Sequence, residues 1–246
     1  MQPEEYDLMY RVETYHWWYL GMESITRALF KQYLGSGPDQ QILDAGCGTG
    51  GALVNYLGDY GRVTGFDLSM IALGYCSLRH IHPLACASVE ALPFAPESFD
   101  LVTSFDVLYE QAVSNDSLVV AEFFRVLVHE GHLLIRLPAY DWLRGRHDQI
   151  VHTARRYTAR QVARLLQDNG FVVECVSYAN TFLFPAALIK RLMERILPSK
   201  SSKSDLSLNM GRFNGLLRAI LSFEAPWVVR TGLPFGLSVI AIARKI

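Results

Sequence analysis

The sequence predicts an α/β domain in which a parallel β-sheet is covered by helices on both faces. From about residue 41, strand-like and helix-like segments alternate, with short loops between them. The strand-like segments are largely apolar, which is typical of strands buried on both faces of a parallel sheet. With 246 residues, of which 50% are hydrophobic and 19% charged, the chain can bury a substantial core. We therefore expect a soluble globular domain of the size of an enzyme.

The elements of this sheet can be assigned in chain order. Ser69 is a suitable N-cap for the second helix, because apolar residues then recur at helical spacing. Gly131 is expected to end the third helix, and the pair Asn169 and Gly170 the fourth. Strands are predicted at 41–46, 62–68, 83–91, 99–109, 132–140, 171–180 and 238–246, and helices at 51–61, 69–80, 117–131 and 158–170.

Two segments lie outside this alternation. Residues 1–40 are predicted to be helical and contain the aromatic run YHWWYLG, from Tyr15 to Gly21. Residues 181–237 separate the last two strands and contain an apolar, basic helix, FPAALIKRLMERILPSK. The polar run at 199–209 is the best candidate for a mobile linker.

The first strand runs into a glycine-rich turn, ILDAGCGTGG at 42–51. Glycines between a first strand and a first helix let the backbone approach a ligand closely, which indicates a nucleotide-like cofactor. Gly46, Gly48 and Gly50 follow the pattern GxGxG, whereas dinucleotide sites have GxGxxG. Asp44 precedes them, and its negative charge would suit a cationic amine or sulfonium and repel a pyrophosphate. The alternative is a tight turn with a purely structural role.

A second acid, Asp67, ends the second strand 17 residues after Gly50. An acid about 20 residues beyond the glycines accepts hydrogen bonds from ribose hydroxyls in nucleotide sites. Leu68 is placed to pack on an adenine face. The alternative for Asp67 is to cap the helix that begins after Ser69.

Charge and cysteine content exclude several classes of protein. A net charge of −1 provides no general basic field, so we expect no nucleic-acid partner. The four cysteines form no CxxC pair and have no histidines nearby at ligand spacing, so we expect free thiols in a reducing compartment and no metal site. The N-terminal residues do not resemble a secretory signal, and no apolar run reaches the length of a spanning helix. We therefore expect a cytoplasmic protein.

Four segments together identify a known family: DAGCGTGG, GFDLS, ASVEALPFAPESFDLV and LLIRLP. They resemble class I S-adenosylmethionine-dependent methyltransferases of the type-11 group, over about residues 40–180 and the last strand. The resemblance implies a Rossmann-like sheet of seven strands in the order 3-2-1-4-5-7-6, with the last strand antiparallel. It also implies a helical lid at 1–40, a core at 41–180 and 238–246, and a helical cap at 181–237.

The resemblance implies the cofactor, S-adenosylmethionine, and the residues around it. Ser88 occupies the adenine-edge position, where the family often has an acid. Phe105, Asp106 and Tyr109 would line the cofactor on the side that faces the substrate. The residues that we expect to bind the cofactor are Asp44, Gly46, Cys47, Gly48, Thr49, Asp67, Leu68, Ser88, Val89, Phe105 and Tyr109.

Methyl transfer from this cofactor is an in-line displacement, so the main task of the protein is to align the reacting atoms. A base is needed only if the acceptor is a hydroxyl or a carbon acid. The candidates are His147, beside Asp148, and also His16 and Tyr140. The alternative for His147 is a histidine on a surface loop.

Other residues are candidates for binding the acceptor. Tyr15, Trp17 and Trp18 could form the wall of an apolar pocket, or else pack the first helix against the sheet. Arg156 could bind an anionic substrate group, although such arginines more often pair with surface acids. The helix at 184–200 could contact a membrane or an apolar substrate, or it could be a packed cap or a dimer contact.

These observations favour methyl transfer to a small, apolar acceptor such as a lipid-like molecule or a secondary metabolite. A homodimer and a peripheral membrane contact through 181–200 are further expectations. The alternatives are a protein methyltransferase, an inactive binding or interaction module with the same fold, and a nicotinamide-dependent dehydrogenase. The GxGxG spacing and Asp44 disfavour the dehydrogenase.

Overall fold

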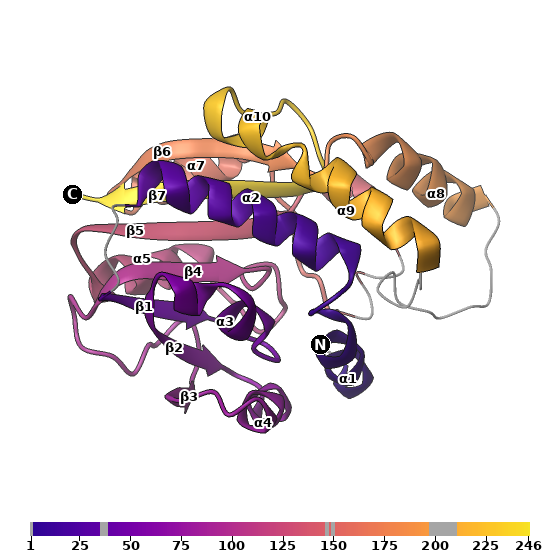
Figure 1. The fold of residues 1–246 in the computed structure, drawn as a ribbon. Helices are drawn as coiled ribbons and strands as arrows, with labels where there is room; N and C mark the ends of the chain where they lie inside the picture. The colour runs from indigo at the N-terminus through magenta and orange to yellow at the C-terminus, as the bar shows by residue number, and fades with distance from the viewer. Residues whose placement is uncertain (1, 35–38, 146–147, 149–150, 197–210) are drawn as a thin grey trace.

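The protein forms one sheet of seven strands in the order β3-β2-β1-β4-β5-β7-β6, as the resemblance implies (Figure 1). The computed structural model describes residues 2–34, 39–145, 148, 151–196 and 211–246. Strands β1 to β5 run parallel, and β7 runs antiparallel to both β5 and β6. The bounds are β1 Gln40–Ala45, β2 Gly61–Asp67, β3 Leu84–Cys86, β4 Phe99–Phe105, β5 Leu127–Pro138, β6 Phe171–Ala179 and β7 Ser238–Lys245.

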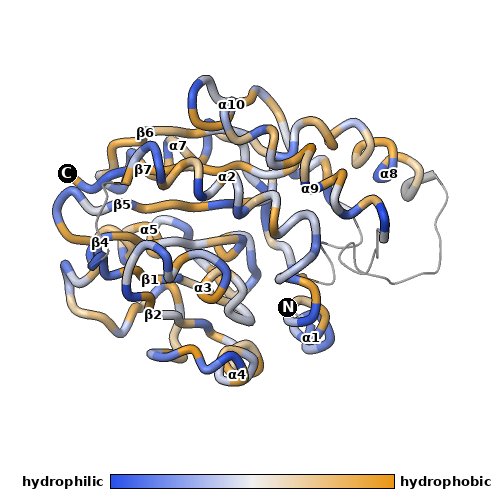
Figure 2. The backbone as a smooth tube through the Cα atoms, in the orientation of Figure 1, coloured by the Kyte–Doolittle hydropathy of each residue, from blue (hydrophilic) through white to orange (hydrophobic). Residues whose placement is uncertain are grey.

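Helices cover both faces of the sheet. On one face, α5 (Asp116–Val126) and α7 (Ala159–Asp168) bury Phe123 and Leu166 in a core shared with the strands. The other face is covered by α2 (Trp17–Tyr33), α3 (Gly51–Asn55), α4 (Met70–Leu78) and α10 (Ala225–Arg230). The hydrophobic segments of the chain gather in the strands and in the helices that face them (Figure 2).

The predicted helix at 117–131 is wrong in its last third. It ends at Val126, and Leu127 begins β5, where it pairs with Phe99 of β4. Gly131 does not end a helix but lies inside β5, beside an irregularity in the pairing with β4. A Cβ atom there would lie 2.8 Å from the carbonyl oxygen of Val128, so the strand can only bulge in this way with glycine.

Three other predicted elements are shorter than expected. The helix at 51–61 stops at Asn55, because Tyr56 leaves the helical conformation with φ −157°, and only a 3₁₀ turn, η1 (Leu57–Asp59), follows. The strand at 99–109 ends at Phe105, because Asp106 adopts φ +59°. Only residues 84–86 of the segment 83–91 pair with a neighbouring strand.

The N-terminal segment divides into two helices with different roles. Helix α2 lies along the sheet and buries Met22, Ile25 and Leu29 completely, so it belongs to the core layer (Figure 1). Of the predicted lid at 1–40, only α1 (Pro3–Val12) lies over the glycine turn, where Met9 reaches Gly48.

The insertion before β7 is helical, as predicted. It contains α8 (Phe184–Ile196), α9 (Asn214–Ser222) and α10, and a 3₁₀ turn, η4 (Gly211–Phe213), precedes α9. Asn214 at the start of α9 accepts from the backbone N–H of Trp17 (2.9 Å) and donates to the carbonyl oxygen of Tyr15 (2.8 Å), which joins α9 to the start of α2. The predicted linker at 199–209 lies outside the described residues. None of the described helices is long and apolar enough to cross a membrane.

Candidate active site

A cavity of about 560 Å³ opens at the carboxyl ends of β1, β2, β4 and β5. Ligands bind at this edge in open α/β sheets, and the volume is within the usual range for a small-molecule site. The cavity extends from the glycine turn to the insertion, with α1 and the start of α2 forming another wall. Most of the residues that sequence analysis predicted to bind a cofactor therefore line one space.

The glycine turn is closely packed from two sides. Gly46 and Gly48 adopt φ +82° and +55°, a region that side chains disfavour. A Cβ atom on Gly46 would lie 2.3 Å from Cγ2 of Val107, and one on Gly48 would lie 2.8 Å from Cε of Met9. The turn can thus present its backbone to the cavity only because these positions have no side chains.

Asp67 is bound directly to this turn. Its Oδ2 accepts a hydrogen bond from the backbone N–H of Gly48 (2.9 Å), and its Oδ1 accepts one from Ser69 (2.8 Å). Ser69 also caps α4 through its side chain, as predicted. Burial raises the pKa of Asp67, although both hydrogen bonds oppose the shift. Each carboxylate oxygen keeps a free acceptor position beside the cavity.

Asp44 lies in β1 just before the turn and is only 2% exposed. Its Oδ1 accepts a hydrogen bond from the hydroxyl of Thr103 (2.7 Å). Burial raises the pKa of Asp44 to about 7, because this single hydrogen bond and the charge of Arg136 compensate only in part for lost solvation. A cationic ligand group near Asp44 would keep the carboxylate ionised.

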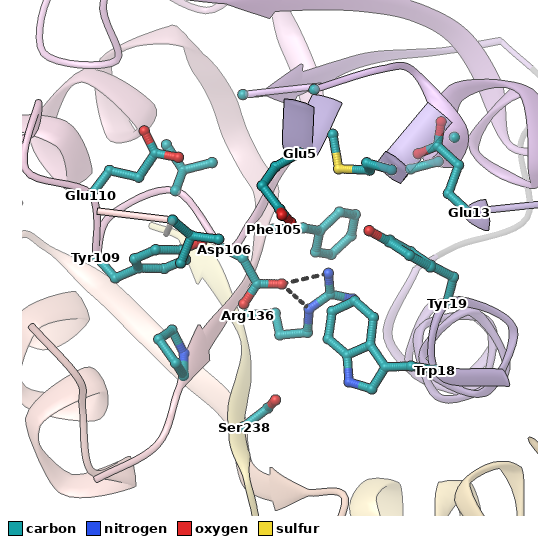
Figure 3. Close-up of a pocket in the computed structure, with 18 of the residues that line it drawn as sticks. Glu5, Glu13, Trp18, Tyr19, Phe105, Asp106, Tyr109, Glu110, Arg136 and Ser238 are labelled. Carbon is teal, nitrogen blue, oxygen red and sulfur yellow. Dashed lines mark hydrogen bonds and ion pairs between the residues drawn. The ribbon is translucent and has the colours of Figure 1, made fainter. Parts of the chain in front are cut away.

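An arginine from β5 occupies the centre of the cavity wall. Arg136 donates from Nε (2.8 Å) and pairs through Nη2 (2.6 Å) with Oδ2 of Asp106, which follows β4 (Figure 3). The guanidinium carbon lies 4.6 Å from the ring centre of Trp18 and 4.9 Å from that of Phe105. An ion pair between two aromatic rings thus connects the two central strands to α2.

The comparison with protein families agrees with this geometry. Residues 43–135, which include the glycine turn, Asp67 and β4, match the family model described as a methyltransferase domain. Residues 43–135 are thus similar to a methyltransferase domain, and they lie within a sheet that has the strand order expected from the resemblance. The match confirms the resemblance inferred from the sequence.

Curated relatives of the methyltransferase domain act on different substrates, according to their names. The malonyl-acyl-carrier-protein O-methyltransferase of Erwinia billingiae is 36% identical over 42% of this chain and 41% of its own length. The ubiquinone/menaquinone biosynthesis C-methyltransferase UbiE of Shewanella halifaxensis is 28% identical over 58% and 60%. The chain therefore spans about half the length of these relatives.

Solved structures share the fold of the methyltransferase domain at low identity. Geranyl diphosphate C-methyltransferase from Streptomyces coelicolor is 18% identical, with a TM-score of 0.59 over 90% of this chain and 78% of its own. The cyclase SpnF is 19% identical, with a TM-score of 0.57 over 90% and 80%. Because both a methyltransferase and a cyclase have this fold, the fold alone does not establish the reaction.

Ten of the eleven residues predicted to bind the cofactor line the cavity of the methyltransferase domain, and Thr49 does not. Thr49 is fully buried, and its hydroxyl donates to Oε1 of Glu13 (2.6 Å). Arg79, which follows α4, pairs with the same oxygen (2.6 Å), so the residue after α1 is joined to the glycine turn and to the end of α4. The ten residues that line the cavity are Asp44, Gly46, Cys47, Gly48, Asp67, Leu68, Ser88, Val89, Phe105 and Tyr109.

The structure gives none of the candidate bases that it describes a geometry suited to accepting a proton in the cavity. Tyr140 is not among the residues that line the cavity and stacks on Tyr178, with ring centres 5.1 Å apart, so nothing in this geometry supports its catalytic role, which stays a prediction. His16 lines the cavity and caps α2, where Nδ1 accepts from the backbone N–H of Trp18 (3.3 Å). Burial lowers the pKa of His16, and a neutral ring that accepts at Nδ1 carries its proton on Nε2, so it is not ready to accept another. His147 lies outside the described residues.

The residues predicted to bind the substrate differ in whether they line the cavity. Trp17 and Trp18 line the cavity, whereas Tyr15 is 56% exposed and does not. Arg156 lines it but is bound to a buried acid, with Nε 2.8 Å from Oδ1 of Asp148. Burial alone would raise the pKa of Asp148, but Arg156 lowers it overall. Arg156 is therefore engaged by a buried acid, whereas the alternative interpretation was a pair with surface acids. Its role in binding a substrate stays a prediction.

Sequence reasoning missed several charged residues of the cavity. Arg136 could have been found, since it is a charged residue in a strand that was predicted to be buried. Glu5, Glu13 and Glu110 also line the cavity, but no local pattern distinguishes them from surface acids. Only the packing of α1 and of the loop after β4 places them there.

Proposed function

We propose that the protein transfers a methyl group from S-adenosylmethionine to a small-molecule acceptor with a sizeable apolar part, by in-line displacement. The observation that carries the proposal is the continuity of the cavity. It runs from the unit formed by the glycine turn and Asp67 to the aromatic ring of Trp18 and the apolar side chains of α8. A methyl donor and an acceptor could thus occupy one continuous space.

The residues of the turn fit this cofactor. Asp67 offers acceptor positions for the two ribose hydroxyls, and Leu68, Ser88 and Val89 line the part of the cavity expected to hold the adenine. A cationic donor suits Asp44, since a positive charge nearby stabilises its ionised form. The cofactor would supply a methyl group activated by a cationic sulfur.

The protein itself would act mainly by alignment. Phe105 and Tyr109 offer aromatic faces, which attract a positive charge, beside the turn. Trp18 is held in place by its contact with Arg136, and α1 covers the turn, so both would help to position the two reactants. Alignment at near contact distance can supply much of the rate of a displacement without a base.

The residues of the insertion that line the cavity are mostly apolar, which supports an apolar acceptor. Leu183, just before α8, Ala186 and Ala187 in its first turn, and Leu217 of α9 line the cavity. The names of similar proteins, which include a quinone-biosynthesis enzyme and a geranyl diphosphate methyltransferase, are consistent with acceptors of this type.

Calorimetric titration with S-adenosylmethionine, S-adenosylhomocysteine and NAD tests the proposal. The wild-type protein should bind both adenosyl ligands and not NAD, and Asp67→Ala should lose most of this affinity. A screen for transfer of a labelled methyl group to apolar acceptors would follow. Binding of NAD alone would overturn the proposal, and tight adenosyl binding without transfer to any acceptor would favour an inactive module.

The insertion also supports a peripheral contact with a membrane, which we propose for α8 and α9. Ile189, Leu192 and Met193 of α8 and Leu216 of α9 are all about half exposed or more, next to a cavity wall formed by the same helices. An acceptor dissolved in a bilayer could enter there. Co-sedimentation with anionic vesicles tests this contact, and a wholly unbound protein would exclude it. The predicted homodimer stays a prediction.

A further inference from the structure

Glu5 on α1 is a buried acid that lacks a partner. Its side chain lines the cavity, and the residue is only 8% exposed. Its Oε2 is inaccessible to solvent and has no hydrogen-bond partner among the described residues. A buried carboxylate oxygen with no hydrogen bond is costly, so its position points to a group that binds there.

The position of Glu5 in its helix does not explain this burial. Acids in the first turn of a helix are favoured by the helix dipole, and both Glu4 and Glu5 lie in the first turn of α1. Glu4 is exposed and meets this preference in water. Glu5 instead turns inward, and Figure 3 shows its carboxylate directed toward Phe105 and the pair formed by Asp106 and Arg136.

The cations that line the cavity are already engaged. Arg136 pairs with Asp106, and Arg156 pairs with Asp148. Lys190 and Arg191 of α8 take part in interactions of their own. No ion pair joins Glu5 to any described residue, so its charge is not balanced within the described part of the chain.

The surroundings of Glu5 suit an organic cation. Glu110 adds a second acid to the cavity, and burial raises its pKa. Tyr19 lies close enough to Glu5 and Asp106 to interact electrostatically with both carboxylates. Phe105 and Tyr109 add further aromatic faces to the cavity. Carboxylates combined with aromatic faces are the groups that bind ammonium ions in proteins.

We propose that Glu5 binds an ammonium group of the acceptor, so that the acceptor is an amphipathic amine. This inference rests on the proposed function and names its substrate class. The ammonium group would donate to the carboxylate of Glu5 where this residue lines the cavity, and the apolar part would extend toward Leu183, just before α8, and Ala187 of α8. Asp67 and Asp44 are left for the ribose and the positive charge of the methyl donor.

The test is calorimetric titration of the protein saturated with S-adenosylhomocysteine, with octylamine, octanol and octanoate as probes. Because a charged hydrogen bond in a buried site stabilises a complex more than a neutral one does, octylamine should bind at least about tenfold more tightly than octanol. Octanoate should bind most weakly. In Glu5→Gln, the preference for octylamine over octanol should fall to about threefold or less.

Glu4→Gln is the matched control, because it removes the same charge from the same helix turn at an exposed position. It should leave the preference for octylamine unchanged. Thermal unfolding of both variants checks that they fold. Repeating the titrations without S-adenosylhomocysteine measures the preference for octylamine over octanol even if S-adenosylhomocysteine does not bind. This inference and the proposed function can therefore fail separately.

Two results would overturn the inference. The first is equal binding of octylamine and octanol by the wild-type protein, and the second is an undiminished preference in Glu5→Gln. If the second comes with a selective loss of S-adenosylhomocysteine affinity, Glu5 belongs to the cofactor site instead.

Discussion

Glu13 and Arg79 form a buried ion pair, with 2.6 Å between Oε1 and Nη2, that joins the end of the N-terminal helix to α4. Their side chains are only 5% and 12% exposed. The hydroxyl of Thr49 donates to the same carboxylate oxygen, so the pair also holds the glycine turn. Two segments far apart in the sequence thus keep α1 closed over the candidate cofactor site.

Glu13→Gln should therefore loosen α1 and destabilise the protein. The amide can still accept from Thr49, but it leaves the guanidinium of Arg79 buried without its counter-charge, at a cost of about 2–3 kcal/mol. Urea unfolding measures this loss. Arg11→Gln is the control, since Arg11 pairs with Asp7 in an ion pair in which both side chains are exposed, and it should change stability by less than about 1 kcal/mol. Equal effects of the two substitutions would contradict a structural role for the buried pair.

Asp44 should make stability depend on pH. Its pKa in the folded protein is about 7, against an ordinary value of 3.8, so the folded state binds a proton more readily than the unfolded state. The resulting stabilisation is fully present below about pH 4 and is lost as the pH rises through about 7. The difference corresponds to about 4 kcal/mol. Asp44→Asn cannot titrate, so its unfolding free energy should fall less than that of the wild type between pH 4.5 and pH 8. Parallel pH profiles would show that Asp44 is not perturbed.

The same carboxyl group should release a proton when the cofactor binds. At pH 7 a group with a pKa of about 7 is half protonated, and a sulfonium or ammonium ion nearby would lower that pKa. Calorimetry of S-adenosylmethionine binding in buffers with different ionisation enthalpies measures the proton release, which should approach about half a proton per site. Asp44→Asn should bind without this release. A buffer-independent binding enthalpy in the wild type would place the cation away from Asp44.

Gly48→Ala should impair cofactor binding far more than it impairs folding. Position 48 requires φ +55°, and the added Cβ atom would press on the flexible end of Met9. The cost to stability should be about 1–2 kcal/mol, whereas the altered turn should weaken S-adenosylhomocysteine binding by about tenfold or more. Gly74→Ala, in α4, is the control, because a Cβ atom there meets nothing within 4 Å. It should leave binding unchanged, and an equal effect of both variants on binding would argue against a special role for the turn.

Features of the fold that depend on neighbouring residues could be read directly from the sequence. The turn from Gly46 to Gly50 and Asp67 at the end of β2 were predictable, because each results from a strand that ends at a particular residue. The cap of α4 at Ser69 was predictable for the same reason. The strand order followed from the resemblance and was confirmed.

Features that depend on contacts between distant segments could not be read in this way. Gly131 was assigned to the end of a helix, but pairing with β4 extended β5 past it and used it as a bulge. Thr49 was assigned to the cofactor, but Glu13 and Arg79 hold its hydroxyl. In both cases a local preference was overruled by a partner far away in the sequence.

The sequence by itself determined the class of fold and the half of the site that surrounds the glycine turn, since both depend on short-range patterns of apolar residues, glycines and acids. Only the tertiary structure decided which charges face the cavity. It paired Arg136 with Asp106 and Arg156 with Asp148, and it left Glu5 without a partner. The physical reason is that burial and ion pairing depend on which helices cover the carboxyl edge of the sheet. The charged side chains at that edge come from segments that meet only in the folded chain.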